Sequence, residues 1–447
     1  MRSRLVAAVL ASVLSCAAHA TNWLQLQGNE APNAPAFRVF GFIQPTYTWI
    51  DAEPITTLQG AAAVHNGKYT TLNLNWPDLQ HPHQFQVMRA GLGARGRLSD
   101  AINYFVALDA GENGTTYYHD VVLTDASLTF NLIPGARVRA GLFKLPTSEE
   151  ALLAVNTSSP YVYNSNAVLY MLVGLPVRSN GAVNAGGTSS ADLSSGFSGY
   201  RDWGVQVYDW FTQGQWEYSY AAMLSNGDAI DRPRDSDGRK DATLRFQASY
   251  LLGKPGPNRE DVSAFVWRQS GARLFGTQHY ALVREGAGLK YLQGDYRASA
   301  EYLRADGMVV GGQAPPFVGQ PFAAGVNEQA SGWYVEGGWR FLPQWEGLAL
   351  RLSGLHDAEP RQRARVHHHH AGHPVLHQPG HPHHLQLRMA QDESVQPRRH
   401  RRRCRARQRA RHRRQSGRPR QSAADLVVLI IALPAIRAAV PYPRTCV

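Results

Sequence analysis

Few residues in this chain of 447 have the types and spacing of a catalytic or ligand-binding group. The segment GLGARG (91–96) has the glycine spacing of a dinucleotide-binding turn, in which backbone N–H groups at a helix start hold a pyrophosphate. A true dinucleotide turn opens a helix, whereas this segment lies within an alternating strand pattern between Arg89 and Arg97. We therefore expect glycines that allow curvature or close packing, and no nucleotide cofactor.

Carboxylates and imidazoles offer two further possibilities. Glu149 and Glu150 could suggest a glycosidase, but adjacent carboxylates cannot flank a scissile bond, and the sequence places no second acid opposite them. His81 and His83 flank Pro82 without a partner at metal-ligand spacing, so we interpret them as surface residues. A serine nucleophile elbow is also missing from the sequence. We therefore predict that the protein is not an enzyme and uses no cofactor or metal.

The charge of the chain is unevenly distributed. Lys and Arg number 46 against 34 Asp and Glu, which gives a formal net charge of +12. Acidic residues slightly outnumber basic ones before Pro360, whereas the positive excess, most histidines and only one aromatic residue, Tyr442, lie beyond it. Cys16, Cys404 and Cys446 leave the body of the chain without cysteine, which excludes a disulfide-built fold. The two parts must be interpreted separately.

Residues 1–20 have the order of a secretory signal: positive charge, an apolar stretch and small residues at the cleavage site. We predict cleavage before Thr21; a lipoprotein processing site at Cys16 is the weaker alternative. The longest later apolar stretch, 424–436, is too short for a membrane helix and contains Pro434. The chain is therefore expected to be exported, either as a soluble protein or as an outer-membrane barrel.

Residues 37 to 357 alternate between apolar and polar residues in segment after segment. In 243–252 one face carries Leu, Phe, Ala and Tyr, and the other carries Thr, Arg, Gln and Ser. Short turns such as 98–100 and 133–135 alternate with long polar stretches, and about 14 segments have the ~9–11 residues of a tilted membrane strand. This pattern predicts an all-β fold, a transmembrane antiparallel β-barrel with a water-filled interior.

Charged residues on the polar faces of these segments are expected to line the pore. Such charges would set ion preference, although a solvated wall without selectivity is an equally good interpretation. Lys144 breaks the alternation and is predicted to end its strand beside a loop. The pore-lining candidates are Arg89, Arg95, Arg97, Arg137, Arg139, Arg245, Arg297, Glu301, Glu336 and Arg340.

Several segments resemble, in their order along the chain, the phosphate-selective porin family of Gram-negative outer membranes. They are RVFGFIQPTYTWID (38–51), RGRLSD (95–100), YFVALDAG (104–111), DASLTFNL (125–132) and VRAGLFKLPTSEE (138–150). The resemblance implies a barrel of about 16 strands, usually a homotrimer, with one long loop folded into the pore. Residues 146–202 are the expected position of that loop. Anion-selective members carry dense Lys and Arg in the pore, and the acidic balance of this body argues against a strong phosphate preference.

Residues 361–447 follow neither pattern. The histidines at 367–370 and the arginine-rich stretch 398–414 could bind a metal or nucleic acid, but an exported chain rarely meets a nucleic acid. DNA that encodes 371–393 can also encode, in a shifted frame, two alternating strands and a turn. We therefore predict a frameshifted, disordered tail without function. The barrel, 21–360, would then be incomplete, and its two unpaired edges would impair assembly in lipid.

The leading function is an outer-membrane porin for passive diffusion of small hydrophilic solutes and ions, with anions such as phosphate as candidates. Its expected partners are membrane lipid, two further copies in a homotrimer and the solutes in transit, and no nucleic acid. The alternative is a barrel that acts as a surface adhesin or structural anchor through loops such as 307–329. A soluble periplasmic binding protein would need buried helices that the pattern does not show.

Overall fold

The structure is a computed structural model in which β-strands dominate. It describes residues 20–21, 28–49, 54, 56, 66–69, 79–113, 115–116, 121–153, 164–172, 177–183, 189–193, 200–230, 235, 237–254, 258–275, 278–311, 323–325, 327–342, 345–358, 363–372, 385–391 and 426–431.

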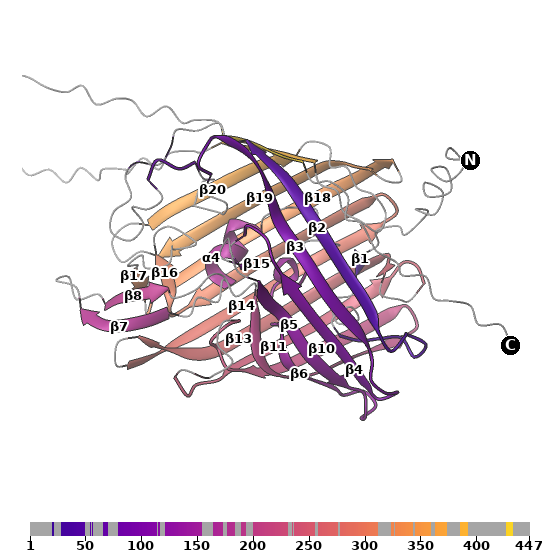
Figure 1. Cartoon of the computed structure of the whole chain (residues 1–447). Coiled ribbons are helices and arrows are strands. Elements are labelled where there is room, and N and C mark those ends of the chain that lie inside the picture. Colours follow the sequence, from indigo (N-terminus) through magenta and orange to yellow (C-terminus); the bar gives the residue numbers. More distant parts are fainter. Residues whose placement is uncertain are drawn as a thin grey trace, which may run out of the picture.

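Sixteen strands of the described residues form one antiparallel sheet (Figure 1). Each strand pairs with the one before and the one after it in the sheet, and β22 lies against β2, so the two ends of the sheet meet as in a barrel. The strands in sheet order are β2 (Arg38–Trp49), β3 (His83–Arg97), β4 (Ile102–Asp109), β5 (Val122–Phe130), β6 (Arg137–Lys144), β9 (Arg201–Gln213), β10 (Trp216–Ser225), β11 (Asp241–Leu251), β13 (Asp261–Phe275), β14 (Gln278–Gln293), β15 (Tyr296–Asp306), β18 (Gln329–Leu342), β19 (Trp345–Ala358), β20 (Arg363–Gly372), β21 (Leu385–Gln391) and β22 (Leu426–Ile431).

The two faces of the sheet differ because successive side chains of a strand point to opposite sides. In β11 the side chains of Thr243, Arg245 and Gln247 are at most 2% exposed, whereas Leu244 and Phe246 are 58% and 47% exposed. The polar face of β11 is the inner face of the curved sheet, and the apolar face is the outer one. The predicted all-β fold and the predicted faces of this segment are confirmed.

The connections between strands are mostly short at one end of the sheet, and several are long at the other end. The short-turn end carries the turns at 98–101 and 131–136, as predicted, and the turns at 214–215 and 294–295. Glycines take the positive φ that three of these turns require: Gly135, Gly214 and Gly294. The long-loop end carries the connections that follow β2, β6 and β15.

Part of the longest of these connections, residues 145–200, packs against the inner face of the sheet. It contains α3 (Glu149–Leu152), α4 (Asn166–Leu172) and the pair β7 (Val177–Val183) and β8 (Ser189–Leu193). Val168 and Met171 of α4 form an apolar core with Trp267, Leu303 and Tyr334 of the inner face, and Figure 1 shows α4 inside the curved sheet. We call residues 145–200 the connecting loop; it lies where the family resemblance implies a pore loop.

The remaining described elements are small. β1 (Ala20–Thr21) pairs with β12 (Asn258–Arg259), and β16 (Val309–Gly311) pairs with β17 (Ala323–Gly325). None of the helices in the described part of the chain has the length and apolar character that a membrane-spanning helix requires. Most of the predicted signal, residues 1–19, lies outside the described residues.

The tail differs from the sequence expectation. β20, β21 and β22 lie beyond residue 360 and complete the sixteen-strand sheet, whereas the sequence pattern suggested disorder there and about 14 strands before it. Backbone hydrogen bonds need no particular side chain, so an unpaired sheet edge can accept strands of unusual composition. The reading-frame hypothesis itself stays a prediction.

The GLGARG segment lies inside β3 and opens no helix. A Cβ atom at Gly91 would lie 2.2 Å from the ring of Phe42, and one at Gly93 would lie 2.3 Å from the ring of Phe40. Both rings belong to β2, so these glycines make room for close packing between neighbouring strands. The prediction of a strand in place of a nucleotide-binding turn is confirmed.

Candidate functional site

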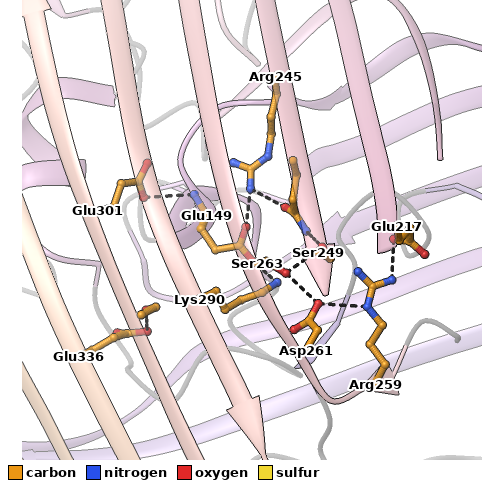
Figure 2. A network of polar contacts seen from close by, with 12 residues as sticks. Glu149, Glu217, Arg245, Ser249, Arg259, Asp261, Ser263, Lys290, Glu301 and Glu336 are labelled. Atoms are coloured by element: carbon orange, nitrogen blue, oxygen red, sulfur yellow. Dashed lines mark hydrogen bonds and ion pairs between the residues drawn. The ribbon is translucent and has the colours of Figure 1, made fainter. Parts of the chain in front are cut away.

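Glu149, in α3, connects the connecting loop to two strands of the inner face, as Figure 2 shows. Its Oε2 atom lies 2.6 Å from Nη2 of Arg245 on β11, and its Oε1 atom lies 3.0 Å from Nζ of Lys290 on β14. The side chains of Glu149, Arg245 and Lys290 are only 2%, 0% and 11% exposed. A buried carboxylate is tolerated when it is paired and hydrogen-bonded, so this group fixes the position of the loop.

The ionisation of Glu149 follows from the same contacts. Burial alone would raise the pKa of this carboxyl, but the charges and hydrogen bonds of Lys290 and Arg245 outweigh burial and hold its pKa below the ordinary value. Glu149 is therefore ionised at neutral pH. The contact between the loop and the wall is therefore one between charged groups.

Glu301 on β15 forms a second contact with the loop. Its carboxylate accepts hydrogen bonds from Ser148 Oγ at 2.7 Å, Trp267 Nε1 at 2.6 Å and Tyr334 OH at 2.7 Å. Glu301 was predicted to line the pore, and it does point to the inner face. Its oxygens, however, are used to hold Ser148 at the start of α3.

Two further contacts hold the loop in place, one between two parts of the loop and one between the loop and β6. Glu150 accepts hydrogen bonds from both the backbone N and the Oγ of Ser165, each at 2.6 Å, just before α4. Lys144, the last residue of β6 as predicted, donates to the carbonyl oxygens of Ala151 and Leu153 at 2.9 Å. Glu149 and Glu150, for which the sequence indicates no enzymatic role, are structural anchors of this loop.

A second ionic group lies at the short-turn end. Arg259 Nη1 lies 2.5 Å from Oε1 of Glu217, and Arg259 Nε lies 3.0 Å from Oδ2 of Asp261. Ser263 Oγ donates to the same Asp261 oxygen at 2.8 Å (Figure 2). None of these residues was a sequence candidate, although Glu217 and Asp261 alternate with the apolar positions of their strands.

The three arginines predicted on β3 each have a polar partner. Arg89 Nη1 donates to Oε1 of Gln44 at 2.9 Å. Arg95 contacts the carboxylate of Glu30, and Arg97 contacts that of Asp100. The structure does not bring these arginines to the Glu149 group.

The remaining candidates are held in a similar way. Arg137 forms an ion pair with Asp209. Arg139 is buried, with its Nε 2.9 Å from Ser127 Oγ. Arg297 lies 3.7 Å from the carboxylate of Glu336. The side chain of Arg340, on β18, lies outside the described part of the structure.

Sequence reasoning missed Glu30 and Lys290 as site residues. Lys290 shares the parity of Gly286 and Gly288 on the inner face of β14, and that parity is a usable signal. Glu30 precedes the first strand of the sheet and shows no period that could have placed it.

Several solved structures are similar to this chain. The anion-selective porin from Comamonas acidovorans is 10% identical, with 89% of this chain and 99% of that chain covered and a TM-score of 0.50. Salmonella typhi OmpF in complex with daunomycin is 8% identical, with 89% of this chain and 97% of that chain covered and a TM-score of 0.49. A further porin structure is 9% identical, with 89% of this chain and 99% of that chain covered and a TM-score of 0.45.

No family model and no curated protein matches the chain. The similarity to the Comamonas acidovorans porin shows that the chain has the fold of a porin β-barrel. It shows the fold alone, and membership of the phosphate-selective porin family stays a prediction.

Proposed function

We propose that this protein is an outer-membrane porin, a water-filled channel through which small hydrophilic solutes and ions diffuse passively. The observation that carries the proposal is the division of the sheet into a polar inner face and an apolar outer face. Large apolar side chains are exposed on the outside of strand after strand, as lipid contact requires. Examples are Val39, Ile43, Leu92, Val106, Leu128, Val205, Leu244, Phe246, Val262, Val266, Leu289 and Val335.

This function sets the orientation and the partners of the chain. In outer-membrane barrels the short turns face the periplasm and the long loops face the outside. The predicted signal sequence would supply export, and the apolar outer face would contact lipid and neighbouring copies. We propose a homotrimer; native mass spectrometry of the purified protein in detergent should give three copies, and a single copy would contradict this.

The ion preference of the channel is proposed to be weak. Several arginines at the inner face lie beside a carboxylate, and paired charges leave a smaller net field for passing ions than isolated ones. These pairs are Arg95–Glu30, Arg137–Asp209, Arg201–Asp125, Arg245–Glu149 and Arg297–Glu336. The family resemblance would imply anions such as phosphate, and the pairing favours instead only a small preference among ions.

Single-channel recording in planar lipid bilayers tests the proposed function. Purified, folded barrels should give discrete steps of ion current, and a salt gradient should give a reversal potential close to zero. A folded barrel that inserts into the bilayer and gives no current steps would contradict the proposal. That result would favour the surface adhesin or structural anchor.

A further inference from the structure

Residues 28–36, which we call the N-terminal segment, lie against the inner face at the short-turn end. A Cβ atom at Gly28 would lie 3.2 Å from Arg139 Nε and 3.2 Å from Thr129 Oγ1, and both of these side chains are buried on the inner face. A Cβ atom at Gly96 would lie 2.1 Å from the carbonyl oxygen of Ala36. The segment therefore packs against β3, β5 and β6 from the inside.

Glu30 is the charged residue of this segment, and its carboxylate contacts two arginines. Its Oε2 atom lies 3.1 Å from Nη2 of Arg38, and its Oε1 atom contacts Nε of Arg95. The Glu30 side chain is 4% exposed, against 49% for Arg38 and 17% for Arg95. Arg95 also donates to the carbonyl oxygen of Asn29 at 2.9 Å, so the backbone of the segment is held beside the carboxylate.

Arg38 and Arg95 are direct partners in the register of β2 and β3, so their side chains start side by side on one face. Two like charges in that position repel each other unless an anion lies between them. Two guanidinium groups that converge on one carboxylate are also the usual protein arrangement for binding an oxyanion. The anion here is supplied by the chain itself, from a segment outside the barrel strands.

We propose that Glu30 is an internal counter-ion that caps an oxyanion site formed by Arg38 and Arg95 on the channel wall. This inference rests on the proposed channel function and adds a residue that controls which ions bind inside the channel. While Glu30 is bound, its single negative charge offsets one of the two positive charges, and its oxygens occupy the place that a passing oxyanion would take. Without its carboxylate, the pair would take a small oxyanion from solution.

Two variants of the full-length protein test the inference in planar bilayers. Glu30→Gln removes the charge and keeps the shape, and Glu30→Ala also vacates the space. Chloride current is recorded while inorganic sulfate is added from the short-turn side. Sulfate should block Glu30→Ala channels at a concentration about tenfold lower than wild type, because charge-assisted contacts to the arginines replace those of Glu30. The sulfate concentration that blocks Glu30→Gln channels should also be lower than for wild type, by a smaller factor.

The chain offers a matched control for the loss of one negative charge. Glu285 lies on the outer face, 3.0 Å from Arg268, so Glu285→Gln removes the same charge away from the channel. Its sulfate block should equal that of wild type. Adding Arg38→Gln and Arg95→Gln to Glu30→Ala should abolish the added block.

Two results would overturn the inference. Glu30→Ala and Glu30→Gln channels with wild-type sulfate sensitivity would show that no site is capped. A block that survives the loss of both arginines would place the sulfate elsewhere. Wild-type barrels without any current steps would instead overturn the proposed function first, so the two failures can be told apart.

Discussion

Two arginine–glutamate pairs of this barrel have the same chemistry and opposite surroundings. Arg245 and Glu149 meet at 2.6 Å on the inner face and are 0% and 2% exposed. Arg268 and Glu285 meet at 3.0 Å on the outer face and are 60% and 36% exposed. The inner pair joins a loop to the wall, whereas the outer pair joins adjacent strands. The comparison shows that position on the wall decides what an ion pair contributes.

The outer pair lies at the boundary of the apolar band. On β13 the outward residues Val262 and Val266 are followed by Arg268, in the direction of the long loops. On β15 the outward Tyr302 is followed by Arg304, which is the register partner of Glu285. Charges in this row would lie at the level of lipid headgroups and water, where an ion pair contributes little.

The largest effect is expected when the inner pair is broken. Glu149→Gln leaves Arg245 and Lys290 buried without their carboxylate, which should cost about 3–5 kcal/mol of folding free energy. The measurement is heat stability: samples are incubated at increasing temperatures, and gel mobility shows the temperature at which the folded barrel unfolds. A Glu149→Gln barrel as heat-stable as wild type would contradict the structural role of this pair.

The sequence predicted the inner pair only in part. The period-two pattern of 243–252 places Arg245 on the inner face, because a strand alternates strictly. It could not identify Glu149 as the partner, because the contact depends on how the connecting loop, residues 145–200, folds back, and a loop far longer than the usual ~4–6 residues has no path that local patterns predict. The sequence therefore indicates no structural role for the adjacent acids Glu149 and Glu150.

The same division holds for the rest of the site. The turns at 98–101 and 131–136 and the strand around GLGARG followed from local residue types. The contacts of Glu30 could not be predicted in this way, because the segment that contains Glu30 has no alternating pattern and the contacts join it to two separate strands. Local alternation predicts which side of the wall a residue faces, and only the folded chain shows what it meets there.

The next largest loss of stability is expected when close packing between neighbouring strands is disturbed. Gly91→Ala places a methyl group 2.2 Å from the Phe42 ring, and such overpacking should cost about 1–3 kcal/mol. Gly253→Ala is the matched control, since the nearest atom to its Cβ would be 3.9 Å away. The heat stability of the folded barrel is measured for both variants and compared with that of wild type. Equal losses for the two glycines would contradict the packing that the structure shows.

A smaller and pH-dependent effect follows from Glu149. Because its pKa is lower in the folded protein, its stabilising contribution is present above the ordinary glutamate pKa of about 4.3 and is lost as pH falls through the folded value. Wild-type stability should therefore decline below about pH 4.3, with Glu149 as one contributor. Glu149→Gln should show a weaker decline over the same range, and an identical pH profile would contradict the assignment.

The smallest effect is expected at the outer pair. Glu285→Gln should change folding free energy by about 0–1 kcal/mol, because exposed ion pairs are solvated and entropically costly to hold. The same gel measurement applies, together with the channel conductance, which should not change. A loss as large as that of Glu149→Gln would show that the outer pair lies in the apolar part of the membrane.

Single-channel conductance of wild-type and Glu149→Gln barrels, recorded side by side, tests most directly whether this protein is a channel whose loop is positioned by Glu149. We expect discrete current steps for wild type and altered, less uniform steps for Glu149→Gln, because its loop loses the carboxylate contacts to Arg245 on β11 and Lys290 on β14. Folded, inserted wild-type barrels without steps would contradict the channel itself. Identical steps in both proteins would contradict the role of Glu149 in positioning the loop.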